Sequence, residues 1–274
     1  MKKALMIFLL LLLLQRITAQ QDYGNYPVYN GNDLGLTYNK NFSAFRIWSP
    51  TATEAELLMY KEGEGGAANT ISLSKGDHGT WFTSIKGDYA GTFYTFRVKI
   101  NNSWSNEVPD PYAKSAGING KRAMVIDLEQ TNPGGWKDDK SPAFSKTNNP
   151  VDAIIYELHI RDAGIHNNSG IQQKGKFLGL AELGTLSSNG LATGLSHLKE
   201  LGVTHVHLLP FYDYSSVDEK SPGNQYNWGY DPLNYNVPEG SYSTDPYNGI
   251  TRIKELKQMI LAFHKNGIRV IFDA

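Results

Sequence analysis

Residues 203–210 have the sequence VTHVHLLP, a nearly continuous apolar run with the length of one β-strand. Residues 153–160, AIIYELHI, and residues 268–272, IRVIF, are two more runs of this kind. Strands that are covered on both faces of a parallel sheet have this composition, because neither face meets water. The three runs therefore predict three strands of a buried parallel sheet.

Amphipathic helices are predicted between these strands. Leu195–Leu201 repeats leucine at helical spacing, and Gly202 ends it. Ile250–Asn266 places its apolar residues on one helical face, and Gly267 ends it. The order strand, helix, strand, helix, strand is typical of βαβ units in an α/β fold.

The length of this α/β stretch, residues 151–274, limits what it can form. A closed (β/α)8 barrel needs about 250 residues, roughly twice what this stretch supplies, and its last strand is followed only by Asp273 and Ala274. A small three-stranded sheet is one interpretation. We favour the other, in which residues 151–274 are the first three β-strands of a truncated (β/α)8 TIM barrel.

The preceding residues predict an all-β fold. Short runs rich in aromatic and β-branched residues occupy residues 42–48, 80–85, 92–100 and 123–128. Several short strands at this spacing, without a long helical period, predict a β-sandwich module over residues 20–130. Residues 131–150 are polar, lack periodicity and contain several Pro and Gly residues. They are predicted to be a linker between two domains.

The N-terminus predicts export. Lys2 and Lys3 precede an uninterrupted apolar run of eleven residues, Ala4–Leu14. This length suits the core of a signal peptide and is too short to span a bilayer comfortably. We expect residues 1–19 to be a signal peptide, and the mature chain to be periplasmic or extracellular without a membrane span. An uncleaved membrane anchor is the alternative.

Composition excludes several classes of function. The chain of 274 residues has a formal net charge of −1 and contains no cysteine. Because there is no excess of positive charge, no nucleic-acid partner is predicted. The absence of cysteine excludes disulfides and thiol catalysis.

Residues 226–232, YNWGYDP, resemble at all seven positions the signature heptapeptide of type I pullulanases, within the α-amylase superfamily of glycoside hydrolases. They follow the second predicted strand, at the end of the barrel where such folds place their active sites. Residues 155–162, IYELHIRD, and 208–214, LLPFYDY, resemble the first two barrel strands of that family. Residues 106–113, NEVPDPYA, resemble the end of the carbohydrate-binding-type β-sandwich that precedes the barrel in branching and debranching enzymes.

This resemblance implies a secreted hydrolase that cleaves α-1,6-glucosidic branch links in pullulan, glycogen or starch-derived α-glucans with retention. It implies an α-glucan partner and no cofactor. His207 departs from the family, which more often has Gln at this position. A non-catalytic α-glucan-binding protein and a related isoamylase or branching enzyme remain alternatives, although the heptapeptide argues against the latter.

The resemblance also implies that the catalytic residues are not in this sequence. Retaining hydrolysis requires two carboxyl groups about 5 Å apart. The family takes its nucleophilic Asp, acid/base Glu and stabilising Asp from later strands, so we expect them beyond Ala274 and the chain as given to be inactive. Residues 270–273, VIFD, resemble the opening of the first conserved region. Asp273 is therefore expected to line the active site in a supporting role.

The other carboxylates near the heptapeptide are interpreted as structural. These are Asp213, Asp218, Glu219 and Asp231. Asp218 and Glu219 lie in a polar loop and are expected to interact with backbone or solvent. Asp231 precedes Pro232 and is expected to shape the loop.

The predicted substrate-binding residues come from the heptapeptide. In the family the residue that matches Tyr230 stacks on the sugar ring at the cleavage subsite, and a flat π face orients a sugar without a charge. Trp228 and Tyr226 can contribute further faces. Asn227 can bind sugar hydroxyls or stabilise the loop. Asp231 is the last of the predicted substrate-binding residues.

Two other groups of residues are candidates for binding. His205 and His207 share one face of a strand, but no third ligand stands at suitable spacing, so no metal site is predicted. In the β-sandwich, an aromatic set either forms a glucan platform or packs between the sheets: Trp48, Trp81, Tyr94 and Trp104.

Overall fold

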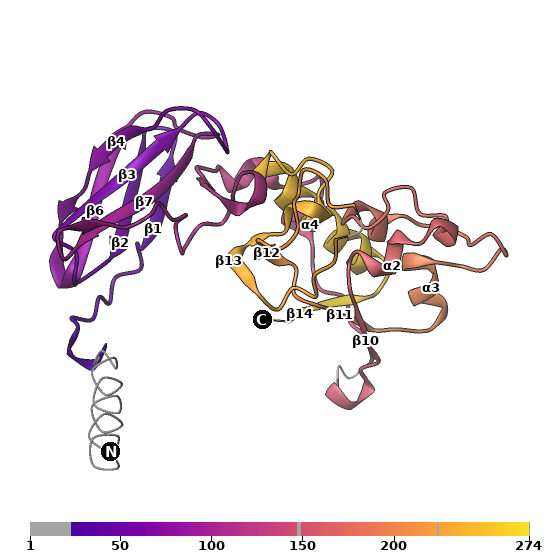
Figure 1. Cartoon of the computed structure of the whole chain (residues 1–274). Coiled ribbons are helices and arrows are strands. Elements are labelled where there is room, and N and C mark those ends of the chain that lie inside the picture. Colours follow the sequence, from indigo (N-terminus) through magenta and orange to yellow (C-terminus); the bar gives the residue numbers. More distant parts are fainter. Residues whose placement is uncertain (1–22, 147–148, 224, 274) are drawn as a thin grey trace, which may run out of the picture.

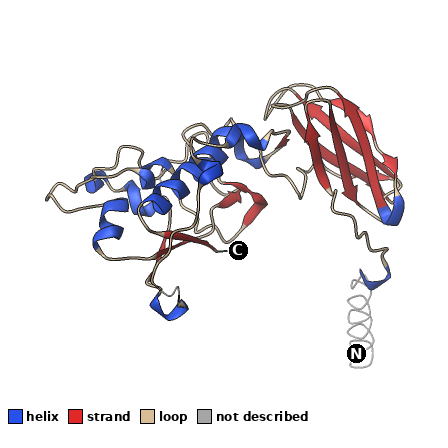
Figure 2. Ribbon diagram, turned by 180° about the vertical axis from the view of Figure 1, so that it is seen from behind, coloured by secondary structure: helices blue, strands red, loops and turns tan. Residues whose placement is uncertain are grey.

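The computed structural model of the chain describes residues 23–146, 149–223 and 225–273. The predicted signal peptide, residues 1–19, lies outside the described residues. The described chain forms a β-sandwich followed by an α/β region, and the segment that connects them contacts the α/β region (Figures 1 and 2). No helix within these three ranges has the length and apolar character needed to cross a bilayer.

The sandwich consists of two antiparallel sheets. One sheet has the order β1 (Gly35–Asn39), β2 (Phe42–Trp48), β6 (Thr80–Lys86) and β5 (Ser74–Lys75). The other has the order β4 (Asn69–Ser72), β3 (Glu54–Tyr60), β7 (Phe93–Ile100) and β8 (Ser103–Trp104), with β9 (Ala123–Met124) paired to β7. The predicted β-sandwich is confirmed.

Aromatic rings fill the space between the two sheets. Phe45 of β2 meets Tyr94 of β7 edge to face at 4.9 Å between ring centroids. Trp81 and Tyr94 are 6% and 1% exposed, so they pack between the sheets and cannot form a glucan platform. Trp48 is 40% exposed at the end of β2. Trp104 lies on the other sheet, where the guanidinium of Arg97 covers its ring at 4.8 Å. The four aromatic residues therefore do not form a single platform.

The α/β region contains the predicted parallel sheet. Its order is β10 (Ile155–Leu158), β11 (His205–Leu208) and β14 (Arg269–Phe272), in continuous register. Its helices are α2 (Asp162–Ile165), α3 (Gly194–Glu200) and α4 (Gly249–Lys265). This is the first part of a (β/α)8 barrel, as predicted, and the two predicted helices are displaced by one residue.

The sheet is open at both edges. Within the described residues, β10 and β14 each pair with β11 alone. Apolar side chains remain exposed on these edge strands, with Ile155 at 57% and Phe272 at 44%. In a closed barrel such side chains would be covered by neighbouring strands and helices.

A second strand pair, which sequence analysis missed, lies between the sandwich and the parallel sheet (Figure 1). β12 (Tyr212–Tyr214) pairs antiparallel with β13 (Pro232–Pro238), with irregular register. The prolines at both ends of β13 and its mixed burial give no clear two-residue period. The heptapeptide 226–232 ends at the first residue of β13.

Short 3-10 helices connect these elements. They lie at Tyr23–Asn25, Asp77–Gly79, Ile118–Gly120, Leu128–Thr131, Trp136–Asp138, Pro150–Asp152, Asn167–Ser169, Leu178–Ala181 and Gly240–Tyr242.

The segment predicted as a linker, residues 131–150, is bound to the α/β region where it is described. Lys257 of α4 donates hydrogen bonds of 2.6 Å to Thr131 and Asn132. His264 Nδ1 lies 2.6 Å from Asp139 Oδ2. Val237 of β13 is fully buried in the hydrophobic core of the sandwich. The β-sandwich and the α/β region therefore contact each other through side chains, and these contacts determine their relative position.

Candidate substrate-binding site

The heptapeptide lies across the carboxyl ends of the three parallel strands. Each strand end contacts it through one residue: His159 after β10, Pro210 after β11 and Asp273 after β14. The chain thus brings the predicted residues Tyr226, Trp228, Tyr230 and Asp273 to one end of the sheet, the end that carries active sites in barrels of this kind.

His159 holds the start of the heptapeptide. Its Nδ1 accepts the amide proton of Asp162 at 3.3 Å, and its Nε2 donates to the carbonyl oxygen of Asn227 at 2.9 Å. The Tyr242 hydroxyl lies 3.0 Å from the same Nε2. Burial lowers the pKa of His159, and the accepting Nδ1 requires the neutral ring. His159 is therefore a neutral structural contact between β10 and the loop.

Asn227 closes the loop on itself. Its side-chain NH2 donates to Asp231 Oδ1 at 2.7 Å and to the hydroxyl of Ser216. Its Oδ1 accepts the amide proton of Gly229 at 2.6 Å. Both amide protons are used within the loop, which favours the stabilising role over direct sugar binding. The contact of Asn227 or Asp231 with a glucan stays a prediction.

Gly229 allows the loop to approach β11. Its φ is +93°, in the region that favours glycine. A Cβ atom at this position would lie 2.0 Å from the carbonyl oxygen of Pro210, which is backbone and cannot yield by a side-chain rotation. The glycine between Trp228 and Tyr230 is therefore required by close packing.

Three aromatic side chains of the heptapeptide remain open to solvent. Tyr226, Trp228 and Tyr230 are 43%, 63% and 57% exposed. The Tyr230 hydroxyl donates to Asp273 Oδ2 at 2.8 Å. This hydrogen bond raises the pKa of Tyr230, so the phenol is a neutral donor at physiological pH. Tyr230 is thus held at its hydroxyl while more than half of its surface is free for a ligand.

Comparison with known proteins agrees with this arrangement. Residues 129–274 match the family described as alpha amylase, catalytic domain. The chain belongs to the α-amylase family. Residues 33–113 match carbohydrate-binding module 48, the isoamylase N-terminal domain.

Proteins similar to this chain include several pullulanases. The pullulanase of Bacillus subtilis is 42% identical over 245 residues, which cover 89% of this chain and 33% of that protein. The crystal structure of apo pullulanase from Paenibacillus barengoltzii is 50% identical with a TM-score of 0.88, over 93% of this chain and 39% of that one. Pullulanase from Bacillus acidopullulyticus is 42% identical with a TM-score of 0.85, over 91% and 30%. The chain spans about a third of the length of these relatives.

A buried ionic cluster, which sequence analysis missed, lies within the α-amylase region. Arg252 of α4 binds Asp213 at 3.0 Å and Glu219 at 2.6 Å, and all three side chains are 0% exposed. The carboxylate of Glu239 lies in the same group, with ligand atoms within 4.8 Å of one another. Glu219 was expected to interact with backbone or solvent: it accepts the backbone amide protons of Asn119 and Gly240, and burial leaves it without contact to solvent. The sequence did contain a signal, because Arg252 precedes Leu256 by four residues and so falls on the buried face of its helix.

These carboxylates cannot act on a polysaccharide. Burial raises the pKa of Glu219 to about 7 and that of Glu239 to about 8. Such values suit a catalytic acid, but the groups have no access to a bulky substrate. Arg252 occupies the position that a cation would take between Asp213 and Glu219. The cluster is interpreted as structural.

The two candidate histidines of β11 have different neighbours. His205 is buried against the ring of Phe144 at 4.7 Å. His207 Nδ1 lies 3.6 Å from a carboxylate oxygen of Glu157 on β10. Among the described residues, neither belongs to a group of three potential metal ligands.

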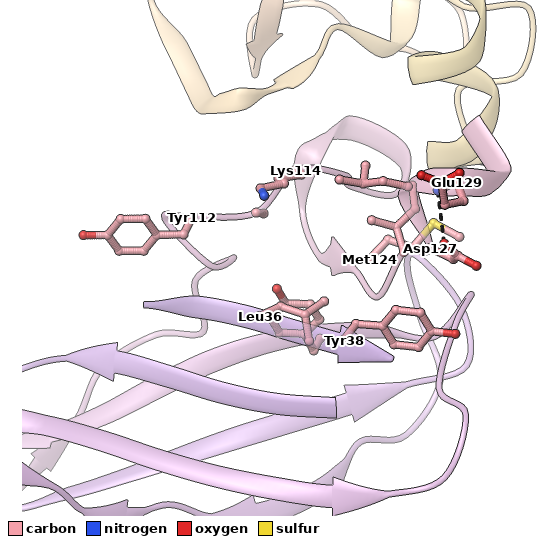
Figure 3. Close-up of a pocket in the computed structure, with 11 residues that line it drawn as sticks. Leu36, Tyr38, Tyr112, Lys114, Met124, Asp127 and Glu129 are labelled. Carbon is pink, nitrogen blue, oxygen red and sulfur yellow. Dashed lines mark hydrogen bonds between the residues drawn. The ribbon is translucent and has the colours of Figure 1, made fainter. Parts of the chain in front are cut away.

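The module contains a separate pocket of about 300 Å³ (Figure 3). Leu36 and Tyr38 of β1 lie on one side, and the lining also includes Tyr112 and the charged residues Lys114, Asp127 and Glu129. All lining residues come from the sandwich and the segment that leaves it. This pocket therefore does not belong to the heptapeptide site.

Proposed function

We propose that this chain belongs to an exported α-glucan debranching hydrolase that cleaves α-1,6-glucosidic links in pullulan, glycogen or starch fragments with retention. The main support is Tyr230, whose hydroxyl is held by Asp273 while its ring is exposed at the carboxyl ends of the strands. A ring in this position offers a flat apolar face to the C–H groups of a glucose unit. The similar pullulanases of Bacillus and Paenibacillus support this assignment.

The bond-breaking groups of the proposed enzyme are assigned to later barrel strands. Retention needs two accessible carboxyl groups about 5 Å apart. The carboxylates of Asp213, Glu219 and Glu239 are buried around Arg252. The carboxylate of Asp273 accepts the hydrogen bond from the Tyr230 hydroxyl. In the proposed enzyme the heptapeptide residues bind and orient the glucan, and we expect hydrolysis to need the part of the barrel after β14.

The full-length gene product tests the proposal. Purified protein is incubated with pullulan, and the products are separated by chromatography while the anomeric protons are followed by NMR. We expect maltotriose released initially as the α-anomer. Release of the β-anomer would contradict retention, and hydrolysis of linear amylose with intact pullulan would contradict debranching.

The chain of 274 residues itself is expected to release no reducing sugar from pullulan above a buffer control. Export is tested separately by N-terminal sequencing of the protein secreted by its host. The expected first residue is near Gln20, and a cytoplasmic protein beginning at Met1 would contradict export.

A second candidate function is glucan binding without catalysis. It is favoured by the match to carbohydrate-binding module 48 and by the pocket that contains Tyr38 and Tyr112. Affinity electrophoresis in gels containing amylopectin measures this binding directly. Retardation of a full-length gene product that hydrolyses no α-glucan would favour this function over the first. Transfer of glucan chains, measured by increased branching, would favour a branching enzyme.

A further inference from the structure

A turn of the sandwich module inserts into the α-amylase region. This turn, residues 117–120, contains Asn119 with a φ of +55°. The Asn119 side-chain oxygen accepts the amide proton of Glu219 at 2.8 Å, and the Asn119 amide donates to Glu219 Oε2 at 2.5 Å. Its side-chain NH2 donates to Asp218 Oδ1 at 3.1 Å. One module residue thus makes three hydrogen bonds to two consecutive residues of a barrel loop.

The loop that Asn119 holds, residues 215–223 and 225, leads into the heptapeptide. The Asp218 amide donates to Gln225 Oε1 at 2.8 Å, and Gln225 is the residue before Tyr226. Ser216, at the other end of this loop, accepts a hydrogen bond from the side chain of Asn227. The contacts run from Asn119 through Asp218 and Gln225 to the start of the heptapeptide.

Buried contacts fix the base of the same turn. Arg252 donates to the carbonyl oxygen of Gly117 at 2.7 Å, and Asn234 of β13 donates to that of Gly120 at 3.0 Å. Both donors are buried, and buried polar groups are costly to separate from their partners. The turn is therefore a rigid support, whereas the loop that it contacts is mostly exposed.

We propose that Asn119 is a positioning residue, through which the module holds the heptapeptide loop in its substrate-binding conformation. The ligand class, an α-glucan at the exposed rings, rests on the proposed function. The positioning itself rests on the hydrogen bonds from Asn119 to Asp218 and Glu219. Asn119 does not touch the glucan in this account.

The variant Asn119→Gly, made in the full-length gene product, removes the side chain but tolerates the positive φ. Asn102→Gly is the matched control, because Asn102 has a φ of +63° in an exposed turn of the same module. Asn119→Asp keeps the acceptor for the Glu219 amide and places a carboxylate against Asp218. Asn119→Asp combined with Asp218→Asn restores a donor–acceptor pair with the two groups exchanged.

The first measurement is independent of activity. The tryptophans are labelled with fluorine, and their NMR signals are assigned with Trp228→Phe and Trp81→Phe. We expect Asn119→Gly to shift or broaden the Trp228 signal, leave the core Trp81 signal unchanged, and lower kcat/KM for pullulan at least about fivefold. Asn102→Gly should change neither the Trp228 signal nor kcat/KM. The double variant Asn119→Asp with Asp218→Asn should restore both the Trp228 signal and kcat/KM.

An unchanged Trp228 signal in folded Asn119→Gly protein would overturn the positioning role. A lower melting temperature with unchanged Trp228 signal and kcat/KM would mean that Asn119 is merely structural, and it would also overturn the proposal. If Asn119→Gly does not fold, Asn119→Asp with and without Asp218→Asn makes the same comparison. If the parent protein hydrolyses no glucan, the proposed function fails while the Trp228 signal still decides the positioning role.

Discussion

The hydroxyl of Tyr230 donates a hydrogen bond of 2.8 Å to Oδ2 of Asp273, a residue 43 positions later in the chain. This contact joins the heptapeptide loop to the end of β14. It leaves the Tyr230 ring 57% exposed. The hydrogen bond orients the ring, and the exposed face of the ring is open to a ligand.

Replacement of Tyr230 should therefore affect turnover as well as binding. In the full-length enzyme, we expect Tyr230→Ala to lower kcat at least about tenfold, because contact with a sugar that distorts towards the transition state stabilises that state most. Tyr230→Phe keeps the ring and should lose less. Steady-state kinetics and melting temperatures of both variants are compared. A well-folded Ala variant with normal kcat would disprove the stacking role.

Gly229→Ala should displace the two rings beside it. The new methyl group would meet the Pro210 carbonyl oxygen at 2.0 Å, in addition to the cost of a positive φ. We expect the free energy of unfolding to fall by at least about 1 kcal/mol. Gly190→Ala is the control, since Gly190 has a φ of +75° and no neighbour within 4 Å of the added Cβ. Chemical denaturation measures both, and equal losses would show that the close approach does not matter.

The buried Glu239 should make stability depend on pH. Burial raises its pKa from 4.5 to about 8, and the charges of Glu219 and Asp213 add to the shift. The folded protein then binds a proton that the unfolded chain has released, so this contribution is complete below about pH 4.5 and is lost as pH rises through about 8.

Glu239→Gln keeps the shape and removes this titration. Between pH 5 and 8.5 we expect the melting temperature of the parent protein to fall by several °C more than that of the variant. The exposed Glu200→Gln is the control and should follow the parent. A variant whose melting curve shifts with pH as much as the parent's would exclude Glu239 as the source.

The β-sandwich and the α/β region should differ in their ability to fold when they are produced as separate fragments. Residues 20–130 keep both sheets and should unfold in one cooperative thermal transition, lowered by the loss of Val237 from their core. Residues 151–274 expose the edges of β10 and β14 and leave Arg252 without Gly117, so they should aggregate or bind a hydrophobic dye as a molten state. Calorimetry and dye fluorescence test this, and a sharp reversible transition of the second piece would contradict it.

The sequence alone determined the fold class, because strands and helices follow from local periodicity. The apolar runs at 203–210 and 268–272 contain β11 and β14, and the repeat after Ile250 predicts α4 within one residue. The heptapeptide was also recognisable, because its seven residues are contiguous. Its position at the strand ends followed from the order of the elements.

Only the tertiary structure decided which polar residues meet. Arg252 binds Glu219, 33 positions away, and Gly117, 135 positions away, and nothing in the local pattern of these segments records the pairing. Asn119 and Glu219 are 100 positions apart and belong to different regions. Hydrogen bonds and ion pairs depend on distance and direction between single atoms. Such geometry is set only when the sandwich, the β12–β13 pair and α4 have packed together.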